Sequence, residues 1–565
     1  MHIKKLLCLF TAFAAACLTA CGSEIKSEDI PSSLYTDGSS QTQTTTVTTT
    51  AAAPEPAPPR LQQAEITGSQ LSYTPFTQTI EAESGKLTGD AKKASQREGF
   101  SGEGYVTGIS AQGQWLVEFD LPQDQYYNVS VAGACDSKNK NAITADGKRL
   151  SSFTFTGNGH FEIIGVKNIY LEKGSHTISI EIPDPSADID YCTVTASEDI
   201  SKLSFALDKP ELSDKNADEN AKALYNYMCS VYGKNIILAQ HDTIGTLSES
   251  QLIYKTTGKR PAIRFGDLMN ATDENTAYCD SDIECAEKFS SLGGIVGYMW
   301  HWKDPVNNKS CYASETDFDL SKAVTKEDIS LLSLEDIEKL KNQGKISGEC
   351  LEIVRDIDTV SQKLSKLQSK GIPVIWRPLH EASNGYFWWG KDAGSYKWLW
   401  QLMYKRQTAY HKLNNLIWVW SAQNASWYVG DSMCDMISCD IYKNDSPGSG
   451  INNLIFLQNI SRKKPAAMTE CDVMPTIRSM VNEKAYWSFI GQWGGNYLMK
   501  QDGSFSQEFT SQKDIQLMYN NNVTLTMDKL PSLSQMKQDL ARAEEKEKAD
   551  KAAEEKSEKE SKKTE

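Results

Sequence analysis

Residues 372–381 read IPVIWRPLHE, and the loop that follows them, residues 382–390, reads ASNGYFWWG. The short apolar run at the start is typical of a buried strand. The strand then ends in an arginine, a histidine and a glutamate, three groups that are costly to satisfy in a hydrophobic core. Carboxylates supply acid/base chemistry for glycosidic bonds, and aromatic faces suit the stacking of sugar rings. The stretch favours a sugar site at a strand end, with an ion-paired strand end over a packed aromatic loop as the alternative.

The sequence on both sides of this strand alternates between strand-like and helical segments. From residue 351 to 367, apolar side chains recur every three or four positions, as on one face of a helix, and Gly371 follows as a helix stop. Residues 205–530 hold eight strand candidates, at 235–239, 261–265, 293–300, 373–376, 415–420, 435–440, 465–469 and 485–491. Eight strand–helix units predict an α/β fold, the (β/α)8 TIM barrel, with its active site at the carboxyl ends of the strands. The long segment 307–346 is expected to form a helical excursion beside that site.

Residues 76–197 carry a different pattern. Apolar and polar side chains alternate, for example over residues 115–119, 127–131 and 176–181, and turn residues separate these runs at short spacing. Such alternation is typical of strands that bury one face. The chain is therefore predicted to be multidomain, with an all-β sandwich, jelly-roll-like in form, before the barrel.

The first 20 residues have the form of a secretion signal. Lys4 and Lys5 precede an apolar stretch, residues 6–18, that is too short to span a bilayer comfortably. Residues 18–22 read LTACG, which resembles a bacterial lipobox and implies cleavage before Cys21 and lipidation of its sulfur. A plain secretory peptide is the alternative. The expected location is extracytoplasmic, on the surface of a bacterial cell, with the membrane contacted only through a lipid anchor.

Two polar segments flank the predicted domains. Residues 21–75 are rich in Ser, Thr and Pro and are expected to form an extended linker. Residues 531–565 form a charged tail, and over residues 541–565 acidic and basic side chains mix without an apolar stripe. That tail is expected to be a solvated single helix or disordered, and no chemistry is assigned to it.

Composition excludes some classes of partner and of enzyme. The formal net charge of −15 disfavours nucleic acids and anionic membrane surfaces, whereas a neutral polysaccharide imposes no charge requirement. The 13 Trp and 23 Tyr suit carbohydrate binding. Position 384 is Asn, so His380-Glu381 lacks the second histidine of a zinc protease helix. No nucleophile elbow and no phosphate-cradling glycine loop occurs in the sequence.

The chain has 13 cysteines. Three of them lie within the predicted signal or at the predicted lipidation site, so 13 − 3 = 10 would remain in the folded domains. An extracytoplasmic location permits disulfides, and Cys279 with Cys285, or Cys135 with Cys192, could pair. A reducing habitat would leave them as thiols, so both states stay open.

A retaining glycosidase needs a second carboxylate about 5 Å from the first. The candidate is Glu470, which follows the seventh strand candidate, while Glu381 follows the fourth. The ends of these two strands face each other across a barrel mouth, so two glutamates there can bracket one glycosidic bond. For Glu470 taken alone, a surface or ion-paired role is the alternative. Arg377 is expected to point into the same site and to lower the pKa of a neighbouring carboxylate. Asp242 and Asp267 also sit at strand ends, without an assigned role.

The string WRPLHE and the aromatic loop after it resemble the active-site signature of glycoside hydrolase family 26, whose characteristic members are β-mannanases. The resemblance implies that Glu381 is the general acid/base and Glu470 the nucleophile. It also implies a tyrosine that hydrogen-bonds the nucleophile, a substrate-binding pair after the third strand and an aromatic floor after the eighth. The substrate-binding roles fall to His301, Trp302, Arg377, His380, Tyr386, Tyr442 and Trp493. A core histidine is the alternative for His301, and Tyr386 departs from the family, in which a Trp is common.

Three segments of the predicted sandwich resemble a carbohydrate-binding module of family 35. They are IEAE at 80–83, the glycine-rich loop 99–106 and IDY at 189–191. The resemblance implies a structural calcium held by Glu81, Glu83 and Asp190, and oxygen-only ligands suit such a hard cation. No cofactor is expected for catalysis. Phe161 falls where such modules often place a loop Trp, and both a sugar contact and inward packing are open for it.

These patterns together predict a monomeric, retaining endo-β-1,4-mannanase that acts on mannan, galactomannan or glucomannan of plant cell walls by double displacement. Within the same family, a mixed-linkage β-glucanase or a β-1,3-xylanase is the alternative. Outside the enzymes, the alternative is a non-catalytic surface glycan-binding protein with a degenerate barrel. The presence of both glutamates argues against that last hypothesis.

Overall fold

The computed structural model describes residues 58–68, 73–110, 112–181, 187–207, 210–273, 277–442 and 448–564. The predicted signal peptide, the lipidation site Cys21 and most of the predicted linker lie outside these residues. Among the helices that the model describes, none is both long enough and apolar enough to cross a bilayer.

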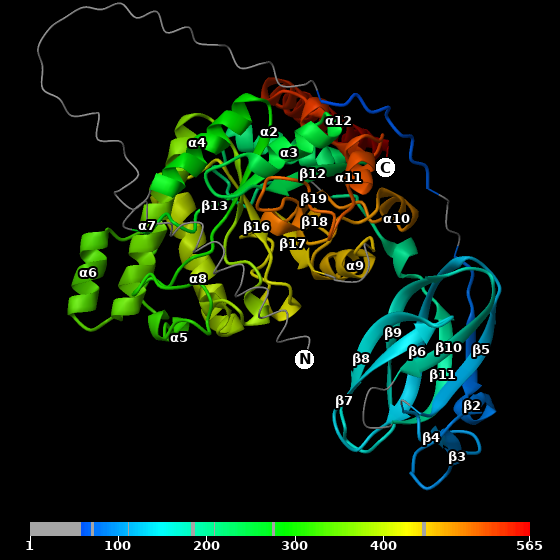
Figure 1. Cartoon of the computed structure of the whole chain (residues 1–565). Coiled ribbons are helices and arrows are strands. Elements are labelled where there is room, and N and C mark those ends of the chain that lie inside the picture. Colours follow the sequence, from blue (N-terminus) through cyan, green and yellow to red (C-terminus); the bar gives the residue numbers. More distant parts are fainter. Residues whose placement is uncertain are drawn as a thin grey trace, which may run out of the picture. The chain divides into compact units, whose positions relative to one another are not determined.

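Eight parallel strands form a closed barrel in the C-terminal part of the chain (Figure 1). They follow one another around the barrel in chain order, and the first pairs with both the second and the eighth. Every residue of these strands is buried, as expected of parallel strands that are covered on both faces. The predicted barrel is confirmed. Its strands are β12 (Ile236–His241), β13 (Ile263–Asp267), β14 (Ile295–Met299), β15 (Val374–Arg377), β16 (Leu416–Trp420), β17 (Met436–Ile441), β18 (Ala466–Cys471) and β19 (Phe489–Gln492).

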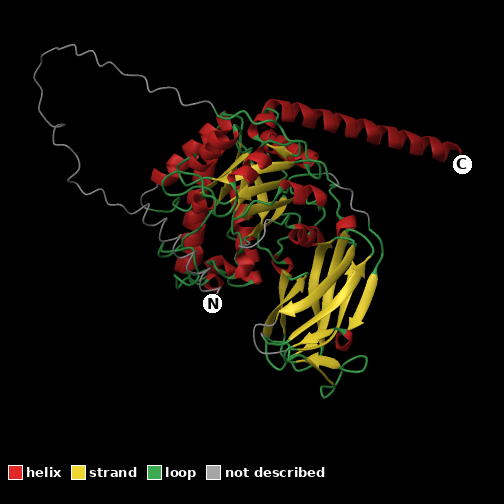
Figure 2. Ribbon diagram, turned by 45° about the vertical axis from the view of Figure 1, so that its right-hand side comes forward, coloured by secondary structure: helices red, strands yellow, loops and turns green. Residues whose placement is uncertain are grey.

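Helices cover the outside of the barrel (Figure 2). The longest of those between strands, α7, shows why they form: Ser347 caps its first turn, one apolar stripe is buried, and Gly371 follows with a φ of +67°. The segment 307–346 contributes two of the helices, as expected. The helices are α2 (Glu219–Val231), α3 (Ser248–Thr257), α4 (Ala277–Ser291), α5 (Leu320–Ala323), α6 (Leu334–Asn342), α7 (Gly348–Ser369), α8 (Ala393–Lys405), α9 (Ile451–Ile460), α10 (Ile477–Asn482), α11 (Gln512–Tyr519) and α12 (Leu533–Thr564).

The charged tail begins as part of the barrel. Helix α12 starts at Leu533 and packs against α2, with Met536 only 4% exposed in the shared core. Leu540 packs against the same core. The first turns of this helix, where three apolar residues at positions 533, 536 and 540 make a short stripe, therefore pack on the barrel although they lie in the segment predicted as the charged tail.

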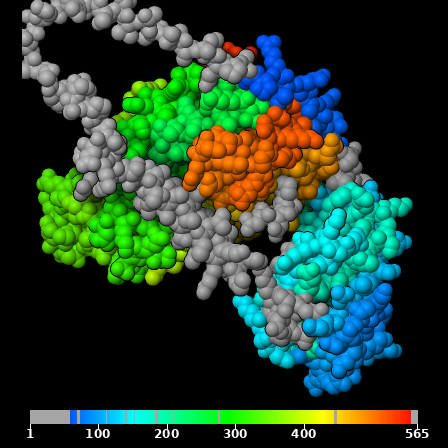
Figure 3. Space-filling model, viewed as in Figure 1, coloured from blue at the N-terminus to red at the C-terminus, as the bar shows by residue number. Residues whose placement is uncertain are grey.

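Residues 58–68, which we call the strap, contact the barrel although the sequence predicted an extended linker there. The Ala64 N–H donates to the Asn520 carbonyl at 2.7 Å, and the Ile66 N–H donates to the Asn522 side chain at 2.8 Å. The Ile66 side chain is 7% exposed and belongs to the barrel core. Figure 3 shows the strap, in blue, against the barrel surface. Composition alone missed it, because only Ile66 and, in part, Ala64 of the described strap pack into the barrel core.

Two antiparallel sheets form the predicted sandwich. One has the order β3-β4-β11-β6-β9 with β1 added on β11, and the other has the order β2-β5-β10-β7-β8. In β5 every second side chain is buried, so Trp115, Val117 and Phe119 enter the core between the sheets. The strands are β1 (Thr77–Glu81), β2 (Lys86–Thr88), β3 (Lys92–Ala94), β4 (Tyr105–Thr107), β5 (Gln114–Leu121), β6 (Gln125–Ala134), β7 (Asn139–Ala145), β8 (Lys148–Phe155), β9 (Glu162–Leu171), β10 (Gly174–Glu181) and β11 (Asp188–Ala196).

The cysteines of the described residues are all free thiols, so neither suggested disulfide is present. Cys279 and Cys285 lie six positions apart on α4, which turns their side chains to different faces of the helix. Cys192 lies opposite Val131 in the sheet, and Cys135 is four residues further along, about 13 Å at the rise of a strand. In this fold the two cysteines of each pair are therefore placed too far apart, or on faces too different, to form a disulfide.

Candidate active site

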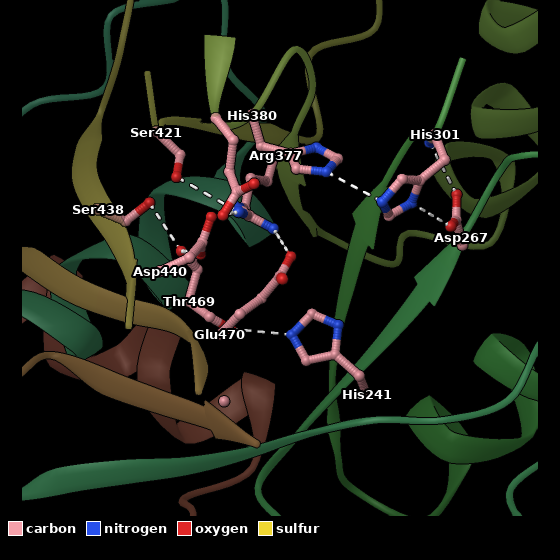
Figure 4. A network of polar contacts seen from close by, with 12 residues as sticks. His241, Asp267, His301, Arg377, His380, Ser421, Ser438, Asp440, Thr469 and Glu470 are labelled. Carbon is pink, nitrogen blue, oxygen red and sulfur yellow. Dashed lines mark hydrogen bonds and ion pairs between the residues drawn. The ribbon is translucent and has the colours of Figure 1, made fainter. Parts of the chain in front are cut away.

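A buried arginine lies at the carboxyl ends of three strands. Arg377 ends β15, and its side chain is fully buried. One arm of its guanidinium donates to Glu470 on β18, and the other donates to Asp440 on β17 (Figure 4). A forked, permanently charged group suits two carboxylates at once. Arg377 therefore gathers the ends of β15, β17 and β18 around a single positive charge.

The register of β17 and β18 brings the two carboxylates together. Asp440 and Glu470 are partners across the strands, and the pairing shifts between Cys439 and Asp440. A shift of this kind re-aims the side chains near it and is frequent beside active sites. The sequence pointed to Glu470 but not to Asp440. The available signal was the place of Asp440 at the end of a strand candidate, two residues before Tyr442.

Glu470 is held as an anion. Arg377 donates to its Oε1, and the Tyr442 hydroxyl donates to its Oε2 at 2.7 Å. Burial alone would raise the pKa of Glu470, but the charges of Arg377 and His241 and the tyrosine hydrogen bond hold that pKa below its ordinary value. The expected effect of Arg377 on a neighbouring carboxylate is thus present in the structure.

Glu381 is held in the opposite state. Its side chain is buried, four residues after the end of β15. Its Oε1 accepts a 3.4 Å hydrogen bond from the Gln423 side chain. Burial and the negative charges of Asp440 and Glu470 raise its pKa well above the ordinary value of a glutamate. At any one pH Glu381 therefore holds a proton more readily than Glu470 does.

Asp440 and Gln423 link the two glutamates. Gln423 donates to Asp440 at 3.1 Å as well as to Glu381, and the Thr469 hydroxyl donates to the other oxygen of Asp440 at 2.7 Å. Burial raises the pKa of Asp440 to about 7, although Arg377 opposes the rise. The four side chains of Arg377, Gln423, Asp440 and Thr469 form a polar frame between the candidate acid and the candidate nucleophile.

A chain of histidines forms the other side of the site. His301, after β14, lies with its Nδ1 2.6 Å from Asp267, and its Nε2 is 3.2 Å from the Nε2 of His380 (Figure 4). Burial alone would lower the pKa of His301, but Asp267 holds it above the ordinary value, whereas burial and Arg377 keep the pKa of His380 well below it. His241 on β12 lies 2.9 Å from the Thr469 carbonyl. Asp267 thus serves as the hydrogen-bond partner of His301. Asp242 instead accepts a hydrogen bond from the Ser250 hydroxyl and does not contact these histidines among the described hydrogen bonds.

Trp493, which is half-buried, and Tyr386, which is exposed, are aromatic side chains in the loops after β19 and β15. Trp493 lies over His241, with ring centroids 4.9 Å apart, and meets His301 edge-on at 5.9 Å. Tyr386 is 47% exposed in the loop after β15. Both positions suit stacking on a sugar ring.

Trp302 is not available to a substrate, which corrects the expectation for this residue. Its side chain is fully buried, its ring stacks on Trp300 at 4.0 Å, and its Nε1 donates to Asp356 on α7 at 2.6 Å. The reason is the alternation of side chains along an extended segment, which sends His301 toward the site and its two neighbours away from it.

In the sandwich, the three predicted calcium ligands gather around the loop 101–103. Glu81 accepts from the Ser101 hydroxyl at 2.9 Å, Asp190 accepts from the Ser101 N–H at 3.0 Å, and Glu83 accepts from the Glu103 N–H at 3.0 Å. The second oxygen of Glu83 is buried without a partner. Burial and the charges of Glu81 and Glu83 raise the pKa of Asp190. Across the described part of the chain, however, no three His, Cys, Asp or Glu side chains are arranged as ligands of one metal ion.

Phe161 lies in a loop beside this group. Its ring meets that of Tyr105 edge-on, with centroids 5.6 Å apart, and is half-buried. Arg97 ties the surrounding loops together by binding Asp136, Asp188 and the Gly159 carbonyl. Phe161 thus packs on Tyr105 with part of its ring and leaves part exposed.

A (β/α)8 barrel with two buried glutamates at the ends of its fourth and seventh strands has the architecture of a glycoside hydrolase. Comparison with known proteins refines this class. The model of the family described as Glycosyl hydrolase family 26 matches residues 213–529, more than half of the chain. The chain therefore belongs to glycoside hydrolase family 26.

Relatives with named activities extend over both domains. The chain is 29% identical to the mannan endo-1,4-β-mannosidase of Thermothelomyces thermophilus, over 80% of this chain and 90% of the relative. It is equally similar to mannan endo-1,4-β-mannosidase B of Piromyces sp., over 80% of this chain and 77% of that one. Among solved structures, it resembles the GH26-CBM35 β-(1,4)-mannanase of Podospora anserina, with 29% identity, 81% of this chain and 99% of that chain covered, and a TM-score of 0.52. A ruminal GH26 endo-β-1,4-mannanase is 25% identical, with 82% and 100% covered and a TM-score of 0.57.

Proposed function

We propose that this protein is a retaining endo-β-1,4-mannanase that hydrolyses mannan, galactomannan or glucomannan. The observation that carries the proposal is that the pKa values of the two glutamates shift in opposite directions: the pKa of Glu381 is raised and that of Glu470 is lowered. An acid and a nucleophile that work together at one pH require such a difference. The names of the relatives support the choice of mannan as the substrate.

In the first step Glu470 attacks the anomeric carbon, and Glu381 gives its proton to the leaving oxygen. The bond between that carbon and the leaving oxygen breaks as the bond to Glu470 forms. Arg377 and Tyr442 each bind one oxygen of Glu470, which limits its rotation and keeps it ionised before the attack. The product of the step is a glycosyl-enzyme.

In the second step water attacks the anomeric carbon and Glu381 takes the proton of that water. Glu470 is now an ester and has lost its charge, so one of the two carboxylate charges that raised the pKa of Glu381 is gone. The ionised form of Glu381 becomes easier to reach when it has to act as a base. Two inversions at one carbon give net retention.

The test measures reducing ends released from galactomannan, mixed-linkage β-glucan and β-1,3-xylan by the purified chain, beside Glu470→Gln. Release from galactomannan that the variant abolishes is the expected result. Early products observed by NMR should carry the β configuration. Release only from the glucan or the xylan would keep the mechanism and replace the substrate. No release from any of the three would overturn the enzyme and favour a glycan-binding protein.

We further propose that the sandwich is a family 35-like carbohydrate-binding module with a structural calcium at Glu81, Glu83 and Asp190. The support is chemical: three carboxylates lie together, and a buried oxygen of Glu83 has no partner. Calcium should raise the melting temperature of the chain and EDTA should lower it. Asp190→Asn should remove that dependence, and a melting temperature indifferent to both additions would contradict the proposal.

We propose, from the lipobox-like sequence, that the protein is a monomer anchored to the bacterial cell surface through Cys21. Mass spectrometry of the protein purified from its own membranes should find a lipidated N-terminal cysteine. Release of the protein into the medium by Cys21→Ser is expected. Retention of the Cys21→Ser protein at the membrane would overturn the anchor.

A further inference from the structure

The acid/base candidate follows an unusual stretch of backbone. Leu379 and Glu381, on either side of His380, both have left-handed backbones, with φ of +53° and +51°. Residues other than glycine take this conformation at an energetic cost, so the surrounding structure must hold them there. The direction in which the Glu381 side chain points depends on that restraint.

The peptide bond between His380 and Glu381 is held at both ends. The His380 carbonyl accepts a 2.8 Å hydrogen bond from the indole Nε1 of Trp389, and the Glu381 N–H donates to the Ser421 carbonyl at 2.8 Å. Ser421 follows β16, and its hydroxyl also accepts from Arg377 at 3.4 Å. One peptide plane is thus clamped between the aromatic loop and the end of the neighbouring strand.

Trp389 is itself firmly placed. Its side chain is fully buried and stacks on Phe387 with ring centroids 4.4 Å apart. Trp388 meets it edge-on and donates its own indole N–H to the Trp302 carbonyl at 2.6 Å. At position 390 the loop passes so close to Ala382 that a Cβ would lie 2.4 Å from the Ala382 carbonyl oxygen, which explains the glycine there.

We propose that Trp389 is a positioning residue for the acid/base, acting through the His380 carbonyl. This inference rests on the proposed function. The Trp389 indole is placed to fix the plane of the peptide that precedes Glu381, and thereby the direction in which the carboxyl presents its proton. Only steps that need a proton from Glu381 depend on this contact, because the nucleophile Glu470 comes from another strand, β18.

The test compares Trp389→Phe with Trp400→Phe in the full chain. Trp400 is also fully buried and donates its indole N–H to a carbonyl, that of Met433, at 2.9 Å, so it is a matched control outside the site. Each variant is measured on mannotetraose, whose leaving group needs a proton, and on 2,4-dinitrophenyl β-mannobioside, whose leaving group does not. Trp389→Phe should lower kcat/KM on mannotetraose about 10- to 100-fold and leave kcat/KM on the dinitrophenyl substrate near the wild-type value. Trp400→Phe should leave kcat/KM near the wild-type value on both substrates.

An equal loss on both substrates, or no loss on either, would overturn the positioning role. If Trp389→Phe does not fold, incorporation of β-(3-benzothienyl)alanine at position 389 keeps the bicyclic shape and removes only the N–H. The same leaving-group dependence is then expected. A wild-type chain that cleaves neither substrate would mark failure of the proposed function, whereas an active wild type with an unaffected variant would mark failure of this inference alone.

Discussion

Asp440 and Glu470 share one arginine, yet their pKa values move in opposite directions. Burial raises the pKa of Asp440 to about 7, while Arg377, His241 and Tyr442 more than offset burial at Glu470 and lower its pKa. Asp440 lacks the tyrosine and accepts instead from Thr469 and Gln423. Of two carboxylates in register on adjacent strands, Asp440 therefore takes up a proton at a higher pH than Glu470 does.

The pH dependence of activity should reflect the two glutamates. Activity on unactivated mannan should fall on the acid side as Glu470 gains a proton and on the alkaline side as Glu381 loses one. The alkaline fall should be absent when wild-type kcat/KM is followed on the dinitrophenyl substrate, whose leaving group needs no proton, and Glu381→Gln should lose kcat/KM on mannan while keeping it on that substrate. Equal losses of kcat/KM on the two substrates in Glu381→Gln would assign the acid to another group.

The free energy of unfolding should also depend on the ionisation of Glu381. The pKa of Glu381 is higher in the folded protein than in the unfolded chain. Its contribution to the free energy of unfolding is therefore fully present below the unfolded-state pKa and is lost as the pH rises through the folded-state pKa. We expect the melting temperature of the wild type to fall more steeply between pH 5 and pH 9 than that of Glu381→Gln, which cannot ionise. Parallel curves for the two proteins would contradict the raised pKa.

Arg377→Lys tests the shared cation. Lysine keeps the charge but cannot donate from two arms of a planar fork, so one carboxylate loses its partner. We expect kcat/KM to fall at least about 100-fold and the acid limb of the pH profile to move to higher pH as the pKa of Glu470 rises. Arg406→Lys is a control, since Arg406 is a fully buried arginine that binds Asp358 with Nε and one Nη. It should lower the melting temperature without moving the acid limb.

Trp302→Phe separates structural from substrate-binding roles. The variant removes the hydrogen bond to Asp356, a carboxyl whose pKa burial raises to about 7, and should destabilise the chain by about 1–3 kcal/mol. KM for mannan should not change. Trp493→Phe should show the reverse, a higher KM with a small change in melting temperature. A raised KM in Trp302→Phe would restore the role that the sequence suggested for it.

Ile66→Ala tests the strap. Truncation of this buried side chain should cost about 2 kcal/mol of stability, seen as a lower melting temperature, and should leave kcat/KM unchanged. A matched change at an exposed site, Leu331→Ala, should have little effect on either quantity. An unaltered melting temperature in Ile66→Ala would show that the strap does not contribute to the barrel.

The sequence predicted the barrel and the strand ends well, because strand ends are where charged side chains follow apolar runs. That rule pointed to Glu381 and Glu470, which lie together with Arg377 and Asp440 at the carboxyl ends of the strands. Asp440 was missed because its importance depends on the register between β17 and β18, which no local pattern reveals. Trp302 was misplaced because proximity to His301 in sequence does not decide on which side of the chain a ring lies.

The contacts described between the strap and the barrel lie next to segments that precede strands. Asn520 and Asn522 come before the short strand β20 (Thr524–Leu525), and Val481, whose side chain lies beside Gly68, is in the last turn of α10, before β19. These are the amino ends of parallel strands, whereas Arg377, Glu381 and Glu470 lie at the carboxyl ends. The strap therefore contacts the barrel at the end opposite the candidate catalytic residues, so a change in the strap need not alter the geometry around Arg377.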